Sequence, residues 1–531
     1  MTTLSQISYQ NALALFDQPQ NLDLLNRIQR GIEKEGLRCS AQGVISQKPH
    51  PKGLGSTLTH PSITTDYSEA LLEFITPVFA SAHEALAYLN IAHRFAYKQL
   101  DGELIWPASM PCILQGEMSI PIAWYGTSNT GRLKHAYRHG LWHRYGRIMQ
   151  TISGIHYNFS MPDALWPVLA KADGFDPADD NPRAMQNYIS ARYFAQIRNF
   201  RRYSWLLMYL FGASPAVCES FLAGRDHKLD RINDHTLYAP YATSLRMSDL
   251  GYQNNAQDGL RVCHNSVTTY VETLGRAIKD PIQAYEQIGV RDTQGDYLQL
   301  NTNLLQIENE YYSDIRPKRV ARHGEKPLQA LARYGVEYIE VRCTDVNPFL
   351  PEGIDVPQMH FMDLFLTWCL LEPSADIDDN EFLRNKRNLH KAVMEGRRPG
   401  LMLERGDKDE SLQQWGLDLI ELMRPLAAAM DKAAGTVFHT DALNQQRLKL
   451  LDAELTPSAR IVRHLKESGD EFSDMTLALA GQHRKTLAED LAPGVYREWQ
   501  QMARDSLQEQ EDIEAADTQS FDDFLQEYLA K

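Results

Sequence analysis

Cysteine is scarce in this sequence and lacks the spacings that would give it a structural role. The 531 residues include six cysteines, and no two of them form a CxxC pair. Without such pairs, neither a zinc-binding motif nor a disulfide framework is indicated. Reduced thiols are the simplest interpretation, and we therefore expect a cytoplasmic protein.

The common nucleotide-binding and hydrolase signatures are also missing. The sequence contains no GxxxxGK[ST], no GxGxxG and no set of kinase motifs. Any ATP would therefore have to be held chiefly through metal ions and arginines. GxSxG and HExxH are absent as well, which argues against a serine hydrolase and a zinc protease.

Positive charge and long apolar runs are both limited. The 54 basic residues are outnumbered by 69 acidic ones, and the formal net charge of -15 disfavours nucleic acid and anionic membranes as partners. The longest uncharged run, from Tyr203 to Cys218, is shorter than the roughly 20 residues that a bilayer requires. Gly212 and Pro215 interrupt it, so we expect a buried helix that ends near Phe211. The N-terminus has no basic segment before its short apolar stretch, so it is not expected to be a signal peptide.

The rest of the composition is that of an ordinary globular protein. It includes 43% hydrophobic and 23% charged residues, enough to build a sizeable core. No Gly/Ser-rich or Pro-rich linker marks a boundary between domains. One large domain with peripheral helical parts is therefore predicted.

Two strand-like stretches near the N-terminus place carboxylates among apolar residues. Residues 28–38, IQRGIEKEGLR, aim Glu33 and Glu35 to the same face of a strand, about 7 Å apart. Residues 71–76 read as a second strand that contains Glu73, and Asp66 lies in the turn region just before it. Glu73, in its apolar run, is expected to have a metal ion or an arginine beside it. For the first stretch taken alone, a solvated strand face is the alternative interpretation.

Two later strands add a histidine and a further carboxylate. Residues 150–160, QTISGIHYNFS, place His156 on the polar face of a strand, although a single histidine is more often structural than a ligand. Residues 336–342, VEYIEVR, aim Glu340 and Arg342 to one face. Together these mostly oxygen donors suit Mg²⁺ or Mn²⁺ rather than zinc. The residues thus indicate a metal-dependent enzyme acting on a phosphate or carboxylate substrate.

Cationic and aromatic side chains for a small polar substrate follow in loops and helices. Tyr137 and Arg138 lie on an expected helix, and Arg246 and Tyr252 are separated by loop-type residues. A surface role is the alternative for the arginines. Residues 298–307 read as another strand, and a basic cluster at 316–319 follows that would suit a polyphosphate or simply be solvated.

Nine motifs, in this order, closely resemble those of the bacterial glutamate–cysteine ligase family of proteobacterial type. They are IQRGIEKEGLR, TTDYSEALLEFITP, SMPC, YGTSNTGR, QTISGIHYNFS, LFGASPAVC, PYATSLRMSDLGY, LQIENEYYSDIRPKR and YIEVR. The resemblance is dense over residues 21–405. We accordingly expect residues 1–531 to form a single catalytic domain, in which residues 406–531 are peripheral and mainly helical.

The resemblance implies an α+β fold similar to glutamine synthetase, with a curved antiparallel sheet forming a funnel inside a layer of helices. It implies ATP-dependent ligation of the L-glutamate γ-carboxylate to the amine of L-cysteine through a γ-glutamyl phosphate. The products would be γ-glutamylcysteine, ADP and phosphate, in the first step of glutathione biosynthesis. A ligase with another amine acceptor, a metal-bound regulatory protein without catalysis and a phosphohydrolase remain alternatives.

The resemblance also implies roles for individual residues. Arg138 and Arg342 would face the phosphoryl group in transfer. The implied ligands of Mg²⁺, or of Mn²⁺, are Glu33, Glu35, Asp66, Glu73, His156 and Glu340. The implied lining of the cysteine pocket is Tyr67, Tyr137, Leu141, Gln150, Ile152, Arg246, Tyr252 and Tyr312. We further expect a monomer, inhibited by glutathione.

Overall fold

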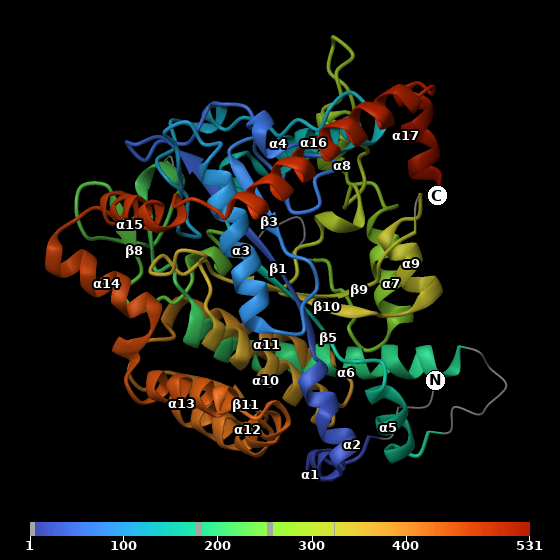
Figure 1. Cartoon of the computed structure of the whole chain (residues 1–531), viewed down its shortest axis with the longest axis vertical. Coiled ribbons are helices and arrows are strands. Elements are labelled where there is room, and N and C mark those ends of the chain that lie inside the picture. The colour runs from blue at the N-terminus through green and yellow to red at the C-terminus, as the bar shows by residue number, and fades with distance from the viewer. Residues whose placement is uncertain (1–5, 176–182, 223, 252–258, 323) are drawn as a thin grey trace.

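A seven-stranded antiparallel sheet runs through the middle of the molecule, with helices around it (Figure 1). This computed structural model describes residues 6–175, 183–222, 224–251, 259–322 and 324–531. The strand order is β2-β3-β1-β5-β10-β9, and β4 pairs with β1. The expected α+β class with an antiparallel sheet is confirmed.

The strands of this sheet come from widely separated parts of the chain. Their bounds are β1 Gln29–Cys39, β2 Ile63–Thr65, β3 Leu71–Ile75, β4 Leu104–Ile105, β5 Ile155–Ser160, β9 Ile315–Lys318 and β10 Tyr338–Thr344. Two small sheets lie outside it, and their strands are β6 Ala216–Cys218, β7 Asp230–Arg231, β8 Thr236–Tyr238, β11 Met402–Arg405 and β12 Lys408–Ser411.

Helices make up most of the remaining described chain. Their bounds are α1 Tyr9–Ala14, α2 Pro19–Leu22, α3 Ala82–Tyr97, α4 Asn129–Tyr145, α5 Leu165–Ala172, α6 Ala184–Phe211, α7 Val267–Ala277, α8 Gln283–Ile288, α9 Pro327–Tyr334, α10 Val356–Leu371, α11 Asp379–Glu395, α12 Leu412–Ala434, α13 Phe438–Leu451, α14 Pro457–Ser468, α15 Phe472–Leu487, α16 Pro493–Ala516 and α17 Phe521–Ala530. The buried helix expected to end near Phe211 is α6, which ends there before Gly212. Among the described helices, none is both long and apolar enough to cross a bilayer.

The register of β1 decides which side chains share a face. Glu33 of β1 lies opposite His156 of β5, and Glu35 lies opposite Glu73 of β3. Successive side chains of a strand alternate between faces, so these four residues project to one side of the sheet. On the neighbouring strand β10, Glu340 lies opposite Asn158 of β5, which projects to the same side as His156. We call this side the polar face.

The opposite side of the sheet, which we call the back face, is covered by helices: α3 packs against β1 and β3, α6 packs against β9 and β10, and α10 packs against both helices. Ile32 and Phe74 are fully buried there in the main core. The guanidinium of Arg30 on β1 donates to Asp363 Oδ2 of α10 from Nε at 3.0 Å, and Tyr157 of β5 donates to Asp363 Oδ1 at 2.7 Å. A single carboxylate on α10 therefore ties the helix to both central strands.

One expected element is wrong. Residues 298–307 are described but form no strand, although their sequence alternates. The buried side chain of Gln299 donates to the carbonyls of Tyr285 and Gly289 at 2.8 Å each, and Gln306 Oε1 accepts from the Leu300 N–H at 3.0 Å. Glu310 Oε2 likewise accepts from the Gln306 N–H at 2.7 Å, so side chains satisfy backbone groups of this stretch that a strand would have paired with a neighbouring strand.

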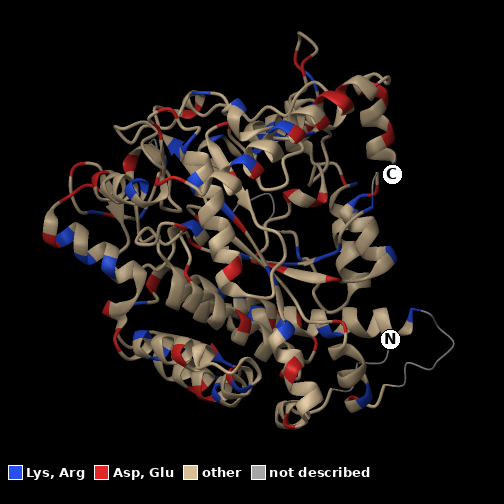
Figure 2. Cartoon of the chain, viewed as in Figure 1, with Lys and Arg blue, Asp and Glu red and all other residues tan. Residues whose placement is uncertain are grey.

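The acidic C-terminal segment lies against the site-bearing half of the chain. The helices α16 and α17, which carry many acidic side chains, cross the top of the molecule (Figures 1 and 2). Glu514 of α16 accepts from the Thr127 N–H at 2.7 Å, and Gln510 accepts from the Ser56 hydroxyl at 2.5 Å. The loops around residues 56 and 127 are therefore held from outside by this helix.

A buried ion pair fixes the end of β1, and its loss should destabilise the fold. Arg38 is fully buried and donates from Nη1 to Glu103 Oε2 at 2.7 Å. Arg38→Met should lower the free energy of unfolding by about 3–5 kcal/mol, because the buried carboxylate of Glu103 loses its cation. Urea denaturation followed by tryptophan fluorescence measures this change. The double variant Arg38→Met/Glu103→Leu should recover part of the loss, whereas an unchanged midpoint for Arg38→Met would contradict the assignment.

Candidate active site

Two side chains of β5 hold Glu33 on the polar face. The imidazole Nδ1 of His156 lies 3.0 Å from Glu33 Oε2, and Asn158 Nδ2 donates to Glu33 Oε1 at 2.9 Å. Burial alone would raise the pKa of Glu33, but the hydrogen bond to His156 holds this pKa below its ordinary value. The expected alternation of the histidine strand is confirmed, since both polar side chains reach the same carboxylate.

Negative charge is in excess beside Glu33. Glu35 Oε2 accepts from the Gly154 N–H at 2.6 Å, and burial raises the pKa of the Glu35 carboxyl. Burial also raises the pKa of Glu73 well above its ordinary value, and the nearby carboxylates of Glu33 and Asp66 raise it further. Carboxylates raise one another's pKa where too few cations lie among them. A bound metal ion would supply the missing positive charge.

The other end of the polar face is richer in cations. Lys318 Nζ of β9 donates to Glu340 Oε1 at 3.1 Å, and Arg342 Nη1 lies 3.2 Å from Glu340 Oε2. Burial opposes ionisation, yet Lys318 and Arg342 hold the pKa of Glu340 well below its ordinary value. Burial would lower the pKa of Arg342, but the charges of Glu340 and Glu33 raise it above its already high value.

The donors on this face fit a divalent cation. Glu33, Glu73 and His156 each offer a ligand atom, and these atoms lie within 4.8 Å of one another. Glu340 Oε2 is buried, and the ion pair with Arg342 is its contact among the described residues, so a lone pair remains for an ion. Carboxylate oxygens dominate the set, as Mg²⁺ and Mn²⁺ prefer.

Arg138 on α4 lies beside the carboxylates rather than on the sheet. Its Nε donates to the Asp66 carbonyl at 2.6 Å, and its Nη2 is 3.8 Å from Asp66 Oδ1. The guanidinium lies 4.5 Å from the centre of the Tyr125 ring, and Lys134, one turn earlier, lies 5.1 Å from the same ring. Burial lowers the pKa of Lys134 to about 8, and the charge of Arg138 contributes.

The residues expected to line a cysteine pocket are mostly brought together. Tyr67, Leu141 and Ile152 are buried in one apolar cluster, and Tyr137 packs against it. Two further members meet as well, because the hydroxyl of Tyr312 donates to Gln150 Oε1 at 3.4 Å. The expected member Tyr252 lies outside the described residues.

Arg246 lies beside the polar face, against Gly154. Its Nη2 donates to the carbonyl of Arg342 at 2.7 Å, and its Nη1 lies 3.8 Å from Asp345 Oδ1. A Cβ at Gly154 would lie 2.1 Å from Arg246 Nη2. Only glycine therefore leaves room for the guanidinium at this position.

Three polar residues of the site were not among the expected site residues. Asn158 and Lys318 each bond a carboxylate of the polar face, and Lys134 lies next to Arg138. Asn158 shares its strand face with His156, and Lys134 lies four residues before Arg138, one helical turn away. Those spacings were the available signals. Lys318 belongs to the basic cluster at 316–319, whose partner strand could not be known from the sequence.

Comparisons with known proteins agree with this arrangement. The family model described as glutamate-cysteine ligase matches residues 13–392. Glutamate–cysteine ligases from Pseudomonas aeruginosa (strain LESB58) and Azotobacter vinelandii are each 51% identical over 98% of this chain, covering 97% and 98% of those proteins. The crystal structure of Francisella tularensis glutamate–cysteine ligase in complex with AMP matches with a TM-score of 0.88 and 36% identity, covering 95% of this chain and 98% of that one.

A bifunctional glutathione synthetase from Pasteurella multocida matches more distantly, with a TM-score of 0.68 and 25% identity over 88% of this chain and 54% of that one. The family predicted from the nine motifs is confirmed, because the family model matches residues 13–392 and the three named ligases each match 95% or more of this chain. The chain therefore belongs to the glutamate–cysteine ligase family, and its reaction joins glutamate to cysteine in the first step of glutathione synthesis.

Proposed function

We propose that the polar face of the sheet binds ATP and glutamate and forms γ-glutamyl phosphate there. The observation that supports this most is the meeting of several carboxylates with Arg342 and Lys318 on one buried face. Such a face matches a polyphosphate, because it carries metal ligands at one end and cations at the other. The proposed metal ligands are Glu33, Glu35, Asp66, Glu73, His156 and Glu340.

In the first step, the γ-carboxylate of glutamate attacks the γ-phosphorus of ATP, and ADP leaves. Bound Mg²⁺, or Mn²⁺ in its place, supplies charge neutralisation on the phosphoryl oxygens. Arg342 and Arg138 brace those oxygens from the protein side, since a planar guanidinium can contact two oxygens at once. Both arginines are held in place beforehand, one by Glu340 and the other by the Asp66 carbonyl, so little reorganisation is needed at the moment of transfer.

In the second step, the amine of cysteine attacks the acyl phosphate carbon, and inorganic phosphate leaves. We propose that Arg246 binds the carboxylate of the incoming cysteine, because its buried guanidinium lies beside the polar face, against Gly154 and the Arg342 carbonyl. Tyr67, Tyr137 and Leu141 would enclose the short side chain. A small pocket of this kind excludes long or charged acceptors by lack of space.

Acceptor specificity tests this proposal directly. With ATP and glutamate present, ADP release should be fastest with cysteine and measurable with 2-aminobutyrate. The rate with 2-aminobutyrate should be lower by about 10- to 200-fold, the range for loss of one small group. Lysine and ammonia should give almost no ADP. Faster ADP release with ammonia than with cysteine would overturn the assignment and favour a glutamine-forming ligase.

The contact between Gly154 and Arg246 gives a second test. In Gly154→Ala the new Cβ would overlap Arg246 Nη2, so the guanidinium must move away. We expect the KM for cysteine to rise by about 10-fold, as for a lost charged hydrogen bond, while the KM for glutamate stays the same. Gly481→Ala is the matched control, because its Cβ would meet nothing within 4 Å. Equal increases in both Michaelis constants would exclude a role of Arg246 specific to the acceptor.

We also propose that the enzyme works in the reducing cytoplasm. The support is that all six cysteines are free thiols and five of them are buried. The pKa of Cys39 is raised by burial to about 12, so this thiol is unreactive at neutral pH. Labelling of the native protein with a thiol reagent should therefore modify Cys263, the one cysteine that is partly exposed, before the others.

A further inference from the structure

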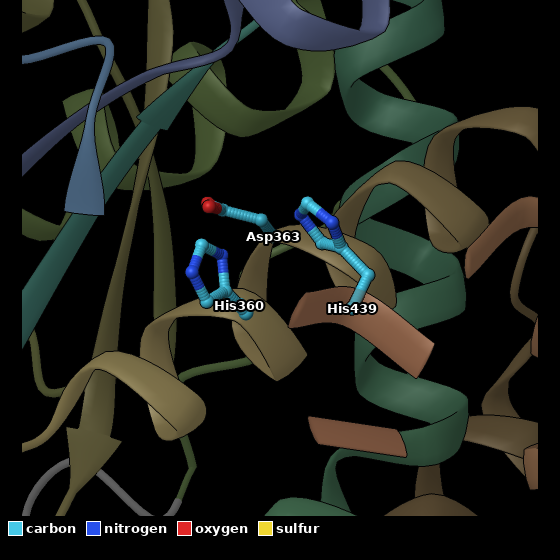
Figure 3. Close-up of side chains that lie close together, drawn as sticks. All are labelled: His360, Asp363 and His439. Carbon is cyan, nitrogen blue, oxygen red and sulfur yellow. The ribbon is translucent and has the colours of Figure 1, made fainter. Parts of the chain in front are cut away.

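A second cluster of metal-ligating side chains lies behind the sheet, away from the polar face. His360 and Asp363 lie on α10, and His439 lies on α13 next to it (Figure 3). Each of the three offers a ligand atom, and these atoms lie within 4.8 Å of one another. Asp363 is fully buried, and the two histidines are 9% exposed. The cluster is therefore almost shielded from solvent.

His360 has no other role that its surroundings explain. Both of its ring nitrogens are buried, and neither has a hydrogen-bond partner within the described part of the chain. The ring stacks on Phe438 with centroids 5.3 Å apart, and its burial lowers the pKa to about 4. The imidazole is therefore neutral at physiological pH, as a metal ligand must be. An unpaired polar group inside a protein calls for an explanation such as an ion.

His439 is oriented as metal-binding histidines usually are. Its Nδ1 lies 3.1 Å from Asp431 Oδ1, and its own backbone N–H donates to the same oxygen at 2.8 Å. Donation from Nδ1 to this carboxylate leaves the lone pair on Nε2, the arrangement in which a carboxylate fixes the tautomer of a ligating histidine. The ring stands at 65° to that of His360, with centroids 4.8 Å apart.

The Oδ1 atom of Asp363 has a lone pair available for a metal ion. Oδ2 accepts from both Nε and Nη2 of Arg30, at 3.0 and 2.9 Å, whereas Oδ1 accepts, among the described residues, only from the Tyr157 hydroxyl, at 2.7 Å. A carboxylate oxygen can accept two hydrogen bonds or ligands, so Oδ1 can also bind an ion. Its hydrogen bonds to the sheet hold it in place, as carboxylate ligands commonly are held.

We propose that His360, Asp363 and His439 form a binding site for a divalent cation of the zinc class, distinct from the carboxylate cluster of the active site. Two imidazoles and one carboxylate are typical zinc ligands, whereas Mg²⁺ prefers oxygen donors alone. Water would complete a tetrahedral set. Since Asp363 also holds β1 and β5, an ion here fastens α10 and α13 together behind the catalytic strands.

Zinc binding by the full-length enzyme tests the site. The protein is stripped with a chelator, dialysed into excess Mg²⁺ to fill the carboxylate cluster, and titrated with Zn²⁺ while bound metal and Tm are measured. Wild type should bind one equivalent and gain in Tm. The double variant His360→Gln/His439→Gln should lose both effects but keep its Mg²⁺-dependent ligase activity. His464→Gln is the matched control and should behave as wild type, because His464 is a surface residue whose Nε2 lies 3.1 Å from Asp470 Oδ2, outside the cluster.

Two further variants are controls. One tests the site without removing a ligand, in case the double variant misfolds, and the other tests whether zinc binds to the carboxylate cluster instead. Asp431→Asn keeps all three ligands and should weaken zinc binding by about 10- to 100-fold, as loss of a supporting carboxylate does. Glu33→Gln alters only the carboxylate cluster and should leave the zinc equivalent unchanged. Undiminished zinc binding by the double variant, or loss of the equivalent in Glu33→Gln, would overturn the proposal.

Discussion

Arg342→Lys should lower kcat by about 100-fold or more, the cost of removing one preorganised donor at a site of developing charge. Arg342 extends from β10 with Nη1 3.2 Å from Glu340 Oε2 and 3.4 Å from His156 Nδ1. Its guanidinium is thus anchored on one side by the sheet, which leaves the rest of the planar group for the phosphoryl oxygens. The ammonium of lysine is a point charge that can keep either the anchor or the substrate contact, but not both.

Steady-state kinetics with each substrate varied in turn measures this effect. We expect kcat to fall while the KM values for glutamate and cysteine change little, because the lost contact strengthens only during phosphoryl transfer. Arg319→Lys is a suitable control, since this nearby arginine pairs with the half-exposed Glu337 at 3.8 Å. If only the KM for glutamate rose in Arg342→Lys, the residue would belong to glutamate binding instead.

The faces of the strands could be predicted from the sequence, because they depend on local alternation alone. Glu33 and Glu35 in one stretch, and His156 in another, lie on the faces that the period of two predicts. The pairing between these stretches could not be read in the same way. Glu33 meets His156 across 123 residues of sequence separation, and that register is set by the packing of the whole sheet.

Three other features could not be predicted from the sequence: a shift in strand register, a stretch that forms no strand, and a cluster between two helices. The register of β10 against β5 shifts between Val341 and Thr344, so the position of Arg342 relative to β5 depends on a local bulge that no simple period encodes. The stretch 298–307 alternates like a strand, yet the side chains of Gln306 and Glu310 accept hydrogen bonds from its backbone N–H groups instead. The His360 cluster arises from contact between two helices, and neither helix shows it alone.

Glu73→Gln should have opposite effects on stability and on activity. Burial and the charges of Glu33 and Asp66 raise the pKa of the Glu73 carboxyl above 4.5 in the folded protein. The folded state therefore binds more protons than the unfolded state, and the stability of the metal-free enzyme falls as pH rises above 4.5 through the folded pKa. Glutamine cannot ionise, so the metal-free variant should be more stable than wild type at neutral pH.

Activity should change in the other direction. Replacing a charged oxygen ligand by a neutral amide weakens the cation site, so ligase activity at a fixed Mg²⁺ concentration should fall by about 100-fold or more. Tm measured with chelator and with Mg²⁺, from about pH 5 to about pH 8, separates the two effects. Wild type should gain in Tm on Mg²⁺ addition, and the variant should gain much less. Glu337→Gln, at a half-exposed carboxylate outside the cluster, should resemble wild type. A Glu73→Gln enzyme that is less stable in chelator, yet gains as much from Mg²⁺ as wild type, would show that the carboxylate is structural rather than a metal ligand.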